Sequence, residues 1–156
     1  MRLNLSNYRI AILAAIFAFV LSIGGTQSAG QTSSTLTVSV TGARNDKGKI
    51  GVTLFKSADG FPSDISKAVF RQSVDIDPHS LGAKVVFKDV LIGTYAVAVL
   101  HDENGNGKMD KNFLGVPKEG YGASNNPPRK MRPPTFDEAK FSLDASEKTV
   151  EIRLIY

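Results

Sequence analysis

The sequence predicts an all-β protein that folds as a single antiparallel β-sandwich of about seven strands. Seven short segments alternate apolar and polar residues with a period of two, as strands with one buried face do. Turn-forming residues separate these segments, and no stretch after the first 30 residues shows helical periodicity over three turns. Many short strands joined by turns are typical of two sheets packed face to face.

The first two strands are predicted at residues 35–41 and 50–54. In both, every second residue is a large aliphatic one. The segment 45–48 between them, Asn-Asp-Lys-Gly, has the composition of a turn. We therefore expect these two strands to pair as a hairpin.

Three further strands are predicted at residues 68–76, 84–90 and 93–101, after a polar loop at 57–66. The segment 93–101 is apolar on both faces, with tyrosine and valine on one face and alanine and leucine on the other. A strand of this kind lies inside a sheet and is covered on both sides.

The last two strands are predicted at residues 140–143 and 149–156. Before them, residues 112–137 are predicted to form a long irregular loop. Loops of more than ~12–15 residues in a compact domain are usually functional or disordered.

The N-terminal segment 1–30 has the three parts of a secretory signal peptide. Arg2 and Arg9 precede an apolar stretch at 10–23, and small residues follow, with cleavage expected between Ser28 and Gly30. The apolar run is shorter than the ~20 residues that span a membrane, so we expect no membrane span after cleavage, although an uncleaved anchor is the alternative. The sequence therefore predicts an exported protein, periplasmic or extracellular, whose folded domain is residues 31–156.

Charge and cysteine content narrow the function further. Setting aside the first 30 of the 156 residues leaves 126, with 17 basic and 15 acidic residues and a net charge of +2. A nearly neutral domain lacks the large excess of basic residues that nucleic-acid binding requires, so we expect no nucleic-acid partner. The chain has no cysteine, which excludes disulfides, thiol nucleophiles and thiolate zinc sites, and two histidines are too few for a structural zinc site.

The segment after the fifth predicted strand resembles the start of a calcium-binding loop. Oxygen-bearing side chains recur at every second residue, a glycine follows at the sixth position, and an aspartate occupies the ninth. Alternate side chains around a tight turn place several oxygens about one hard cation. The candidate ligands for Ca²⁺ are Asp102, Asn104, Asn106, Lys108 through its carbonyl oxygen, and Asp110.

This candidate ligand set is incomplete. Phe113 occupies the twelfth position, where a bidentate glutamate is expected, so Glu119 or Asp89 would have to supply the missing carboxylate. Few charged ligands imply weak binding, with a dissociation constant of ~10⁻⁴–10⁻³ M. The alternative is a plain turn, since the loop contains two Asn-Gly pairs, at 104–105 and 106–107.

The motifs His-Asp-Glu-Asn at 101–104, Asn-Gly-Lys-Met-Asp at 106–110 and Gly-Tyr-Gly-Ala-Ser-Asn-Asn at 120–126 are specific. With them the chain resembles, from about Leu36 to Tyr156, the bacterial family called domain of unknown function 2141. The resemblance implies an exported sandwich of the immunoglobulin-like or prealbumin-like kind and supplies no reaction. The basic, proline-flanked segment 127–134 departs from that family.

The second motif region suggests a binding loop. The aromatic ring of Tyr121 is suited to stack on a sugar or on an apolar group of a partner, and nearby amides offer donors and acceptors. The alternative is a structural loop that uses Tyr121 as a plug. The basic segment 127–134 would touch phosphates or an anionic envelope surface, or be a solvated loop. The candidate binding residues are Glu119, Tyr121, Ser124, Asn125 and Asn126.

These observations favour an exported binding module for an unknown protein or glycan partner of the cell envelope, with loops 101–137 as the recognition surface. The alternative is a structural, envelope-associated protein without a small ligand. A third hypothesis is a hydrolase that uses His101 with Asp102, Glu103 and Ser124. Adjacent residues on a strand point to opposite faces, so no convincing catalytic set emerges and we expect no enzyme.

Overall fold

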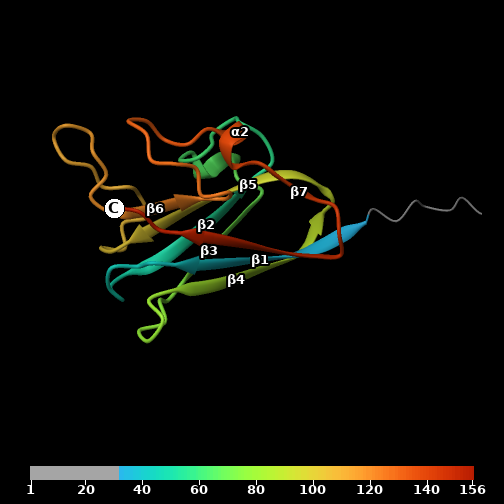
Figure 1. Cartoon of the computed structure of the whole chain (residues 1–156), viewed down its shortest axis with the longest axis horizontal. Helices are drawn as coiled ribbons and strands as arrows, with labels where there is room; N and C mark the ends of the chain where they lie inside the picture. The colour runs from blue at the N-terminus through green and yellow to red at the C-terminus, as the bar shows by residue number, and fades with distance from the viewer. Residues whose placement is uncertain (1–31) are drawn as a thin grey trace, which may run out of the picture. The chain divides into compact units, whose positions relative to one another are not determined.

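The computed structural model describes residues 32–156, which form two β-sheets packed face to face (Figure 1). The all-β sandwich predicted from the sequence is confirmed. Within the described residues no helix is long and apolar enough to cross a membrane. The predicted signal peptide at 1–30 lies outside the described residues.

The smaller sheet has the strand order β4–β1–β8. Its strands are β1 (Ser33–Thr41), β4 (Ala83–Leu91) and β8 (Glu147–Arg153). The pair β1–β4 is antiparallel, whereas β1 and β8 run parallel. The chain crosses from the other sheet before β8 and enters this sheet beside the start of β1, where the N–H of Thr35 donates to the carbonyl oxygen of Ser146. Strand β8 therefore runs in the same direction as β1, and this is the one parallel pairing among the described strands.

The larger sheet has the order β3–β2–β5–β6, and β7 pairs with the start of β5. Its central strand β5 (Gly93–Asp102) is buried on both faces, as predicted. One face contributes to the core between the sheets, and the other is covered by the short helix α2 (Phe136–Ala139) and Phe61. The remaining elements are β2 (Lys49–Phe55), the 3₁₀ helix η2 (Ile65–Lys67), β3 (Phe70–Val74), β6 (Gly120–Ala123) and β7 (Phe141–Leu143).

The predicted hairpin between residues 35–41 and 50–54 is wrong. β1 and β2 lie in different sheets, and each turns its apolar residues into the shared core. The turn-like segment at 45–48 thus belongs to a connection that crosses from one sheet to the other. Alternation shows which face of a strand is buried, but it does not identify the neighbouring strand.

An eighth strand, β6, lies inside the segment that was predicted to be irregular. Its residues pair with Ala98–His101 of β5. Two glycines are required here because other side chains occupy the space above them. A Cβ atom on Gly120 would lie 2.5 Å from Cζ of Tyr156, and one on Gly122 would lie 2.7 Å from a methyl group of Ile152.

Candidate functional site

Two long connections flank β6, residues 103–119 before it and 124–135 after it. Figure 1 shows both projecting at the end of the sandwich where the last residue is marked. Most of the candidate residues lie in these connections. We refer to this part of the molecule, residues 102–134 with the adjoining Tyr156, as the loop end.

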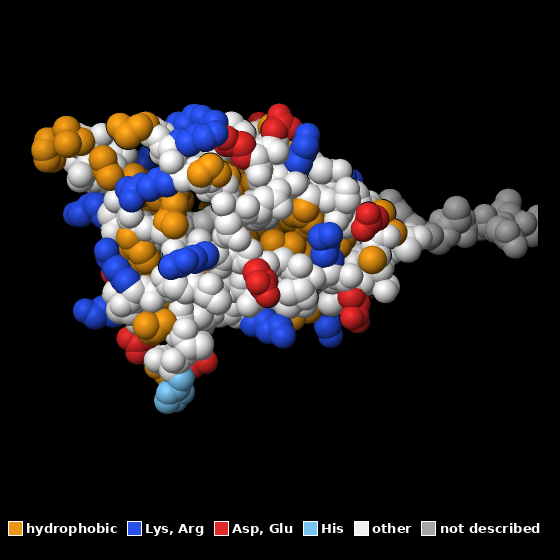
Figure 2. Space-filling view, in the orientation of Figure 1, with side chains coloured by type: hydrophobic (Ala, Val, Ile, Leu, Met, Phe, Trp, Pro, Cys, Tyr) orange, Lys and Arg blue, Asp and Glu red, His pale blue; other side chains and the backbone are white. Residues whose placement is uncertain are grey.

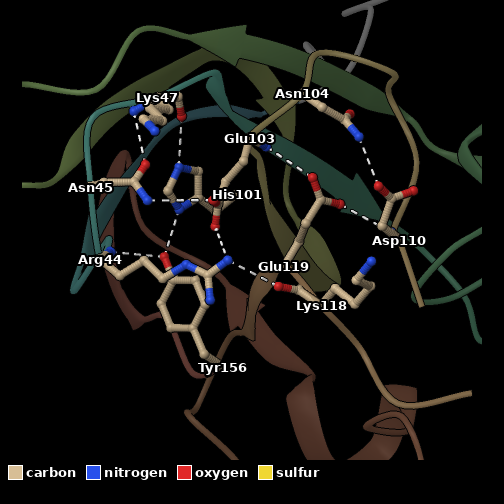
Figure 3. Close-up of polar contacts among 10 residues, drawn as sticks. All are labelled: Arg44, Asn45, Lys47, His101, Glu103, Asn104, Asp110, Lys118, Glu119 and Tyr156. Atoms are coloured by element: carbon tan, nitrogen blue, oxygen red, sulfur yellow. Dashed lines mark hydrogen bonds and ion pairs between the residues drawn. The ribbon is translucent and has the colours of Figure 1, made fainter. Parts of the chain in front are cut away.

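His101 anchors the loop end from inside the core. The side chain is fully buried, and its Nε2–H donates to the carbonyl oxygen of Lys47 at 2.8 Å (Figure 3). Because a carbonyl only accepts, Nδ1 is the unprotonated nitrogen and accepts from the hydroxyl of Tyr156 at 2.5 Å. That hydroxyl in turn accepts from the backbone N–H of Arg44 at 2.9 Å. Burial raises the pKa of Tyr156, which keeps the hydroxyl protonated as a donor.

Arg44 joins the same end from the connection between β1 and β2. Its guanidinium lies 4.7 Å from the ring centroid of Tyr156 and 2.7 Å from a carboxylate oxygen of Glu103 (Figure 3). It also donates to the carbonyl oxygen of Lys118 at 3.1 Å. One side chain therefore ties together β5, the segment before β6 and the last residue.

Glu119, a candidate binding residue, is almost fully buried and holds backbone groups. Its two carboxylate oxygens accept the N–H groups of Glu103 at 2.9 Å and Asp110 at 3.0 Å (Figure 3). The carboxylate closes the loop 103–110 at both ends. Both carboxylate oxygens are therefore used by backbone donors, and within residues 32–156 Glu119 forms no metal-holding cluster with Asp102 and Asp110.

The structure brings the predicted calcium ligands together in one loop. Asp102 accepts the backbone N–H groups of Asn106 at 3.0 Å and Gly107 at 2.7 Å. The carboxylate of Asp110 accepts the side-chain amides of Asn104 at 2.7 Å and Asn106 at 3.0 Å. The backbone N–H of Lys108 donates to the amide oxygen of Asn106 at 2.8 Å.

These residues fit a weak cation site at best. Within residues 32–156 no cluster of three or more histidine, cysteine or acidic side chains is placed to hold a metal. A cation would have only the carboxylates of Asp102 and Asp110, and the amides that now donate to Asp110 would have to turn their oxygens inward. Phe113 points into solvent and Asp89 lies on β4 of the other sheet, so neither completes the set.

Three of the other candidate binding residues fix the backbone after β6. The buried hydroxyl of Ser124 accepts from the N–H of Val97 at 2.9 Å and donates to the carbonyl of Ala139 at 2.6 Å. Asn125 donates to the carbonyl of Lys140 at 2.9 Å. Asn126 accepts from the N–H of Arg153 at 2.8 Å and donates to the carbonyl of Glu151 at 2.9 Å. These partners lie far away in the chain, so the sequence alone carries no sign of them.

The basic segment 127–134 folds back over β6 and encloses a pocket of about 260 Å³. Of the candidate binding residues, Tyr121 and Asn126 line it. Prolines and Ile155 contribute apolar surface, and four basic side chains and one carboxylate also line the pocket. The charged lining residues are Arg129, Lys130, Arg132, Arg153 and Glu138.

The charges around this pocket do not cancel. Arg132 makes two hydrogen bonds to the carboxylate of Glu138, both 2.8 Å, and Lys130 also contacts it, so together they hold the pKa of that carboxyl well below its usual range. Arg129 donates to the main-chain oxygen of Tyr156 at 2.6 Å. Among the described residues no carboxylate pairs with Arg153. Positive charge therefore remains for an incoming anion.

The arrangement proposed for a hydrolase is not assembled. His101 has both ring nitrogens engaged and no exposed surface, so a substrate from solvent does not reach it. Ser124 lies beside Val97, four residues along β5 from His101, which corresponds to about 13 Å. The two side chains therefore form no nucleophile–base pair.

One family model matches the chain. It is described as an uncharacterized protein conserved in bacteria (DUF2141), and it covers residues 38–151. The matched range includes the loop 102–110, β6 and the whole proline-flanked segment. No curated protein and no solved structure matches the chain.

Proposed function

Since the chain belongs to the bacterial DUF2141 family, and its loops enclose a pocket on a rigid sandwich, we propose that it is an exported module that binds a glycan of the cell envelope. The observation that carries the proposal is the lining of the pocket over β6. Its lining combines Tyr121 and apolar residues with four basic side chains and one carboxylate. Periplasmic or extracellular placement follows from the export signal predicted at residues 1–30.

The lining favours a sugar ring that carries an acidic group. Tyr121 and three prolines line the pocket, and arginine binds carboxylates and phosphates through paired, charge-assisted hydrogen bonds. A volume of about 260 Å³ is below the ~300–1,000 Å³ of drug-sized sites, which suits a single ring better than a long segment. Asn126 also lines the pocket, but its amide is hydrogen-bonded to the backbone of Glu151 and Arg153 in β8, so we assign it no direct bond to the ligand.

Arg153→Ala should weaken the binding of glucuronate at least tenfold, because it removes a pocket cation that forms no ion pair with a described carboxylate. Binding of glucuronate to the unaltered protein should weaken with added salt, and glucose should bind much less tightly. Isothermal titration calorimetry measures all three. The matched control is Arg71→Ala, an exposed arginine on β3 that is outside this pocket and should leave the affinity unchanged.

Equal affinity for glucose and glucuronate, or an Arg153→Ala variant that binds like the parent, would contradict the acidic-sugar proposal. Absence of any binding would instead favour the structural, envelope-associated role. The structural role is supported by Ser124, Asn125 and Asn126, whose side chains are already used in hydrogen bonds to the backbone.

We also propose that Ca²⁺ strengthens the loop 102–110 by replacing the two amide donors on Asp110. With a dissociation constant of ~10⁻⁴–10⁻³ M, Ca²⁺ at ten times that constant should add about 1.4 kcal/mol to the free energy of unfolding. Thermal melts in EGTA and then in millimolar Ca²⁺ measure the change. Asp110→Asn should abolish the response, whereas Asp144→Asn, at an exposed position between β7 and β8, should keep it. A midpoint that Ca²⁺ leaves unchanged identifies the loop as a plain turn.

A further inference from the structure

A tight turn at residues 111–117 holds two large apolar side chains in solvent. Phe113 is 94% exposed and Leu114 is 71% exposed. The turn is well ordered by hydrogen bonds: the side chain of Asn112 accepts the N–H groups of Leu114 and Val116 at 2.9 and 3.0 Å, and its backbone N–H donates to Val116 at 2.9 Å. The backbone therefore presents these side chains outward as a fixed tip, which we call the apolar tip.

Basic residues lie on both sides of the apolar tip in the sequence, and among the described residues they form no ion pairs. Lys108, Lys111 and Lys118 flank it, and within residues 32–156 none of the three is in an ion pair. The nearby acids are engaged, since Asp110 accepts two amides and Glu119 is buried under backbone donors. Positive charge next to the tip is thus exposed to solvent.

Within the loop end, positive charge is concentrated in residues 107–134. Residues 107–134 contain six basic and two acidic residues, a net charge of +4, while residues 31–156 as a whole have a net charge of +2. The rest of the domain therefore has a net charge of −2. The segment 127–134 adds another fully exposed apolar side chain, Met131, between Lys130 and Arg132.

Figure 2 shows hydrophobic side chains gathered where the loops project, with lysine and arginine next to them and few acidic side chains. A single exposed apolar residue is ordinary, but adjacent phenylalanine and leucine at an ordered tip are not. An apolar tip surrounded by cations is complementary to one surface in particular, an apolar layer that lies under anionic groups. That is the structure of an anionic lipid bilayer.

We propose that the loop end docks reversibly on an anionic bilayer surface, with Phe113 and Leu114 inserted below the headgroups and the flanking lysines at headgroup level. The inference is independent of the proposed glycan pocket, because neither apolar side chain lines that pocket. Two inserted side chains give weak attachment on their own, so the attraction of the basic side chains to anionic lipid is required. Docking would hold the pocket close to the envelope.

The chain contains no tryptophan, so Phe113→Trp places a single fluorescent reporter at the tip. On vesicles of phosphatidylcholine containing phosphatidylglycerol, its emission should shift to the blue and be quenched by brominated acyl chains. On vesicles of phosphatidylcholine alone it should change little. The matched control is Val86→Trp, at an exposed position on β4 in the other sheet, which should not respond.

The double variant Phe113→Asp with Leu114→Asp should reduce flotation with the phosphatidylglycerol vesicles at least tenfold. Both side chains are in solvent, so the variant should keep the melting temperature of the parent, and Val86→Asp should float like the parent. High salt should release the parent protein. The proposal would be overturned by equal flotation with and without phosphatidylglycerol, or by unchanged flotation of the double variant. It would also be overturned if the blue shift of the Phe113→Trp variant required an added protein instead of lipid.

Discussion

His101→Leu should lower the free energy of unfolding by about 3 kcal/mol, because it removes both hydrogen bonds of a fully buried side chain. The carbonyl oxygen of Lys47 loses its donor and the hydroxyl of Tyr156 loses its acceptor. Leucine fills the buried space, so the loss reports the polar contacts more than a cavity. Urea denaturation measures the change.

The control for this variant is the other histidine. His79 is exposed in the turn after β3, and only its backbone N–H is used, in a bond to Asp77. His79→Leu should therefore change the stability by less than about 0.5 kcal/mol. If the two variants unfold at the same urea concentration, His101 does not anchor the loop end.

Gly48→Ala should lower the free energy of unfolding by about 3–4 kcal/mol, because it introduces both backbone strain and a steric clash. Gly48 has a φ of +70°, and a Cβ atom there would lie 1.9 Å from the carbonyl oxygen of Asp102. That oxygen belongs to the backbone of β5 and has little freedom to move. The connection between β1 and β2 would have to lift from β5, which also breaks the bond from His101 to Lys47.

Gly105→Ala measures the backbone strain without the steric clash. Gly105 has a similar φ of +75°, but nothing lies within 4 Å of its Cβ position. It should cost only the strain of about 1–2 kcal/mol. Equal losses in the two variants, measured by urea denaturation, would mean that the close approach of Gly48 to Asp102 contributes nothing.

The fold class follows from the sequence because strand periodicity is a local property. The apolar faces of β1, β2 and β8 are visible in the spacing of their residues, and the two-sided burial of β5 follows from its unbroken apolar run. Strand pairing is not local. The turn residues at 45–48 suggest a hairpin with β2, but in the structure β4 and β8 pair with the two edges of β1.

The strand β6 was missed for a related reason. Glycine weakens a strand in isolation, and the residues that require glycine here, Ile152 and Tyr156, lie about 30 positions later in the chain. The hydrogen bonds of Ser124, Asn125 and Asn126 also join them to backbone groups that are not their neighbours in the chain. Side chains that looked free for a ligand are therefore used to hold α2 and β8 in place.

The candidate site was partly predictable. The spacing of Asp102, Asn104, Asn106 and Asp110 predicts a Ca²⁺ loop, and this stays a prediction; the four residues are linked by hydrogen bonds within one loop. Tyr121 and the basic segment 127–134 line one pocket, although no sequence pattern indicated that they lie together. Arg153 was not identified, since it comes from β8 and only the packing of that strand brings it to the pocket.

The most direct test of the proposed function is an NMR titration of the amide resonances with glucuronate. We expect saturable shifts that centre on Tyr121, Gly122 and Arg153 and spread into residues 127–134. Glucose at the same concentrations should leave these resonances in place. Saturable shifts that centre on the other end of the sandwich, or the same shifts with glucose, would contradict an acidic-sugar site over β6.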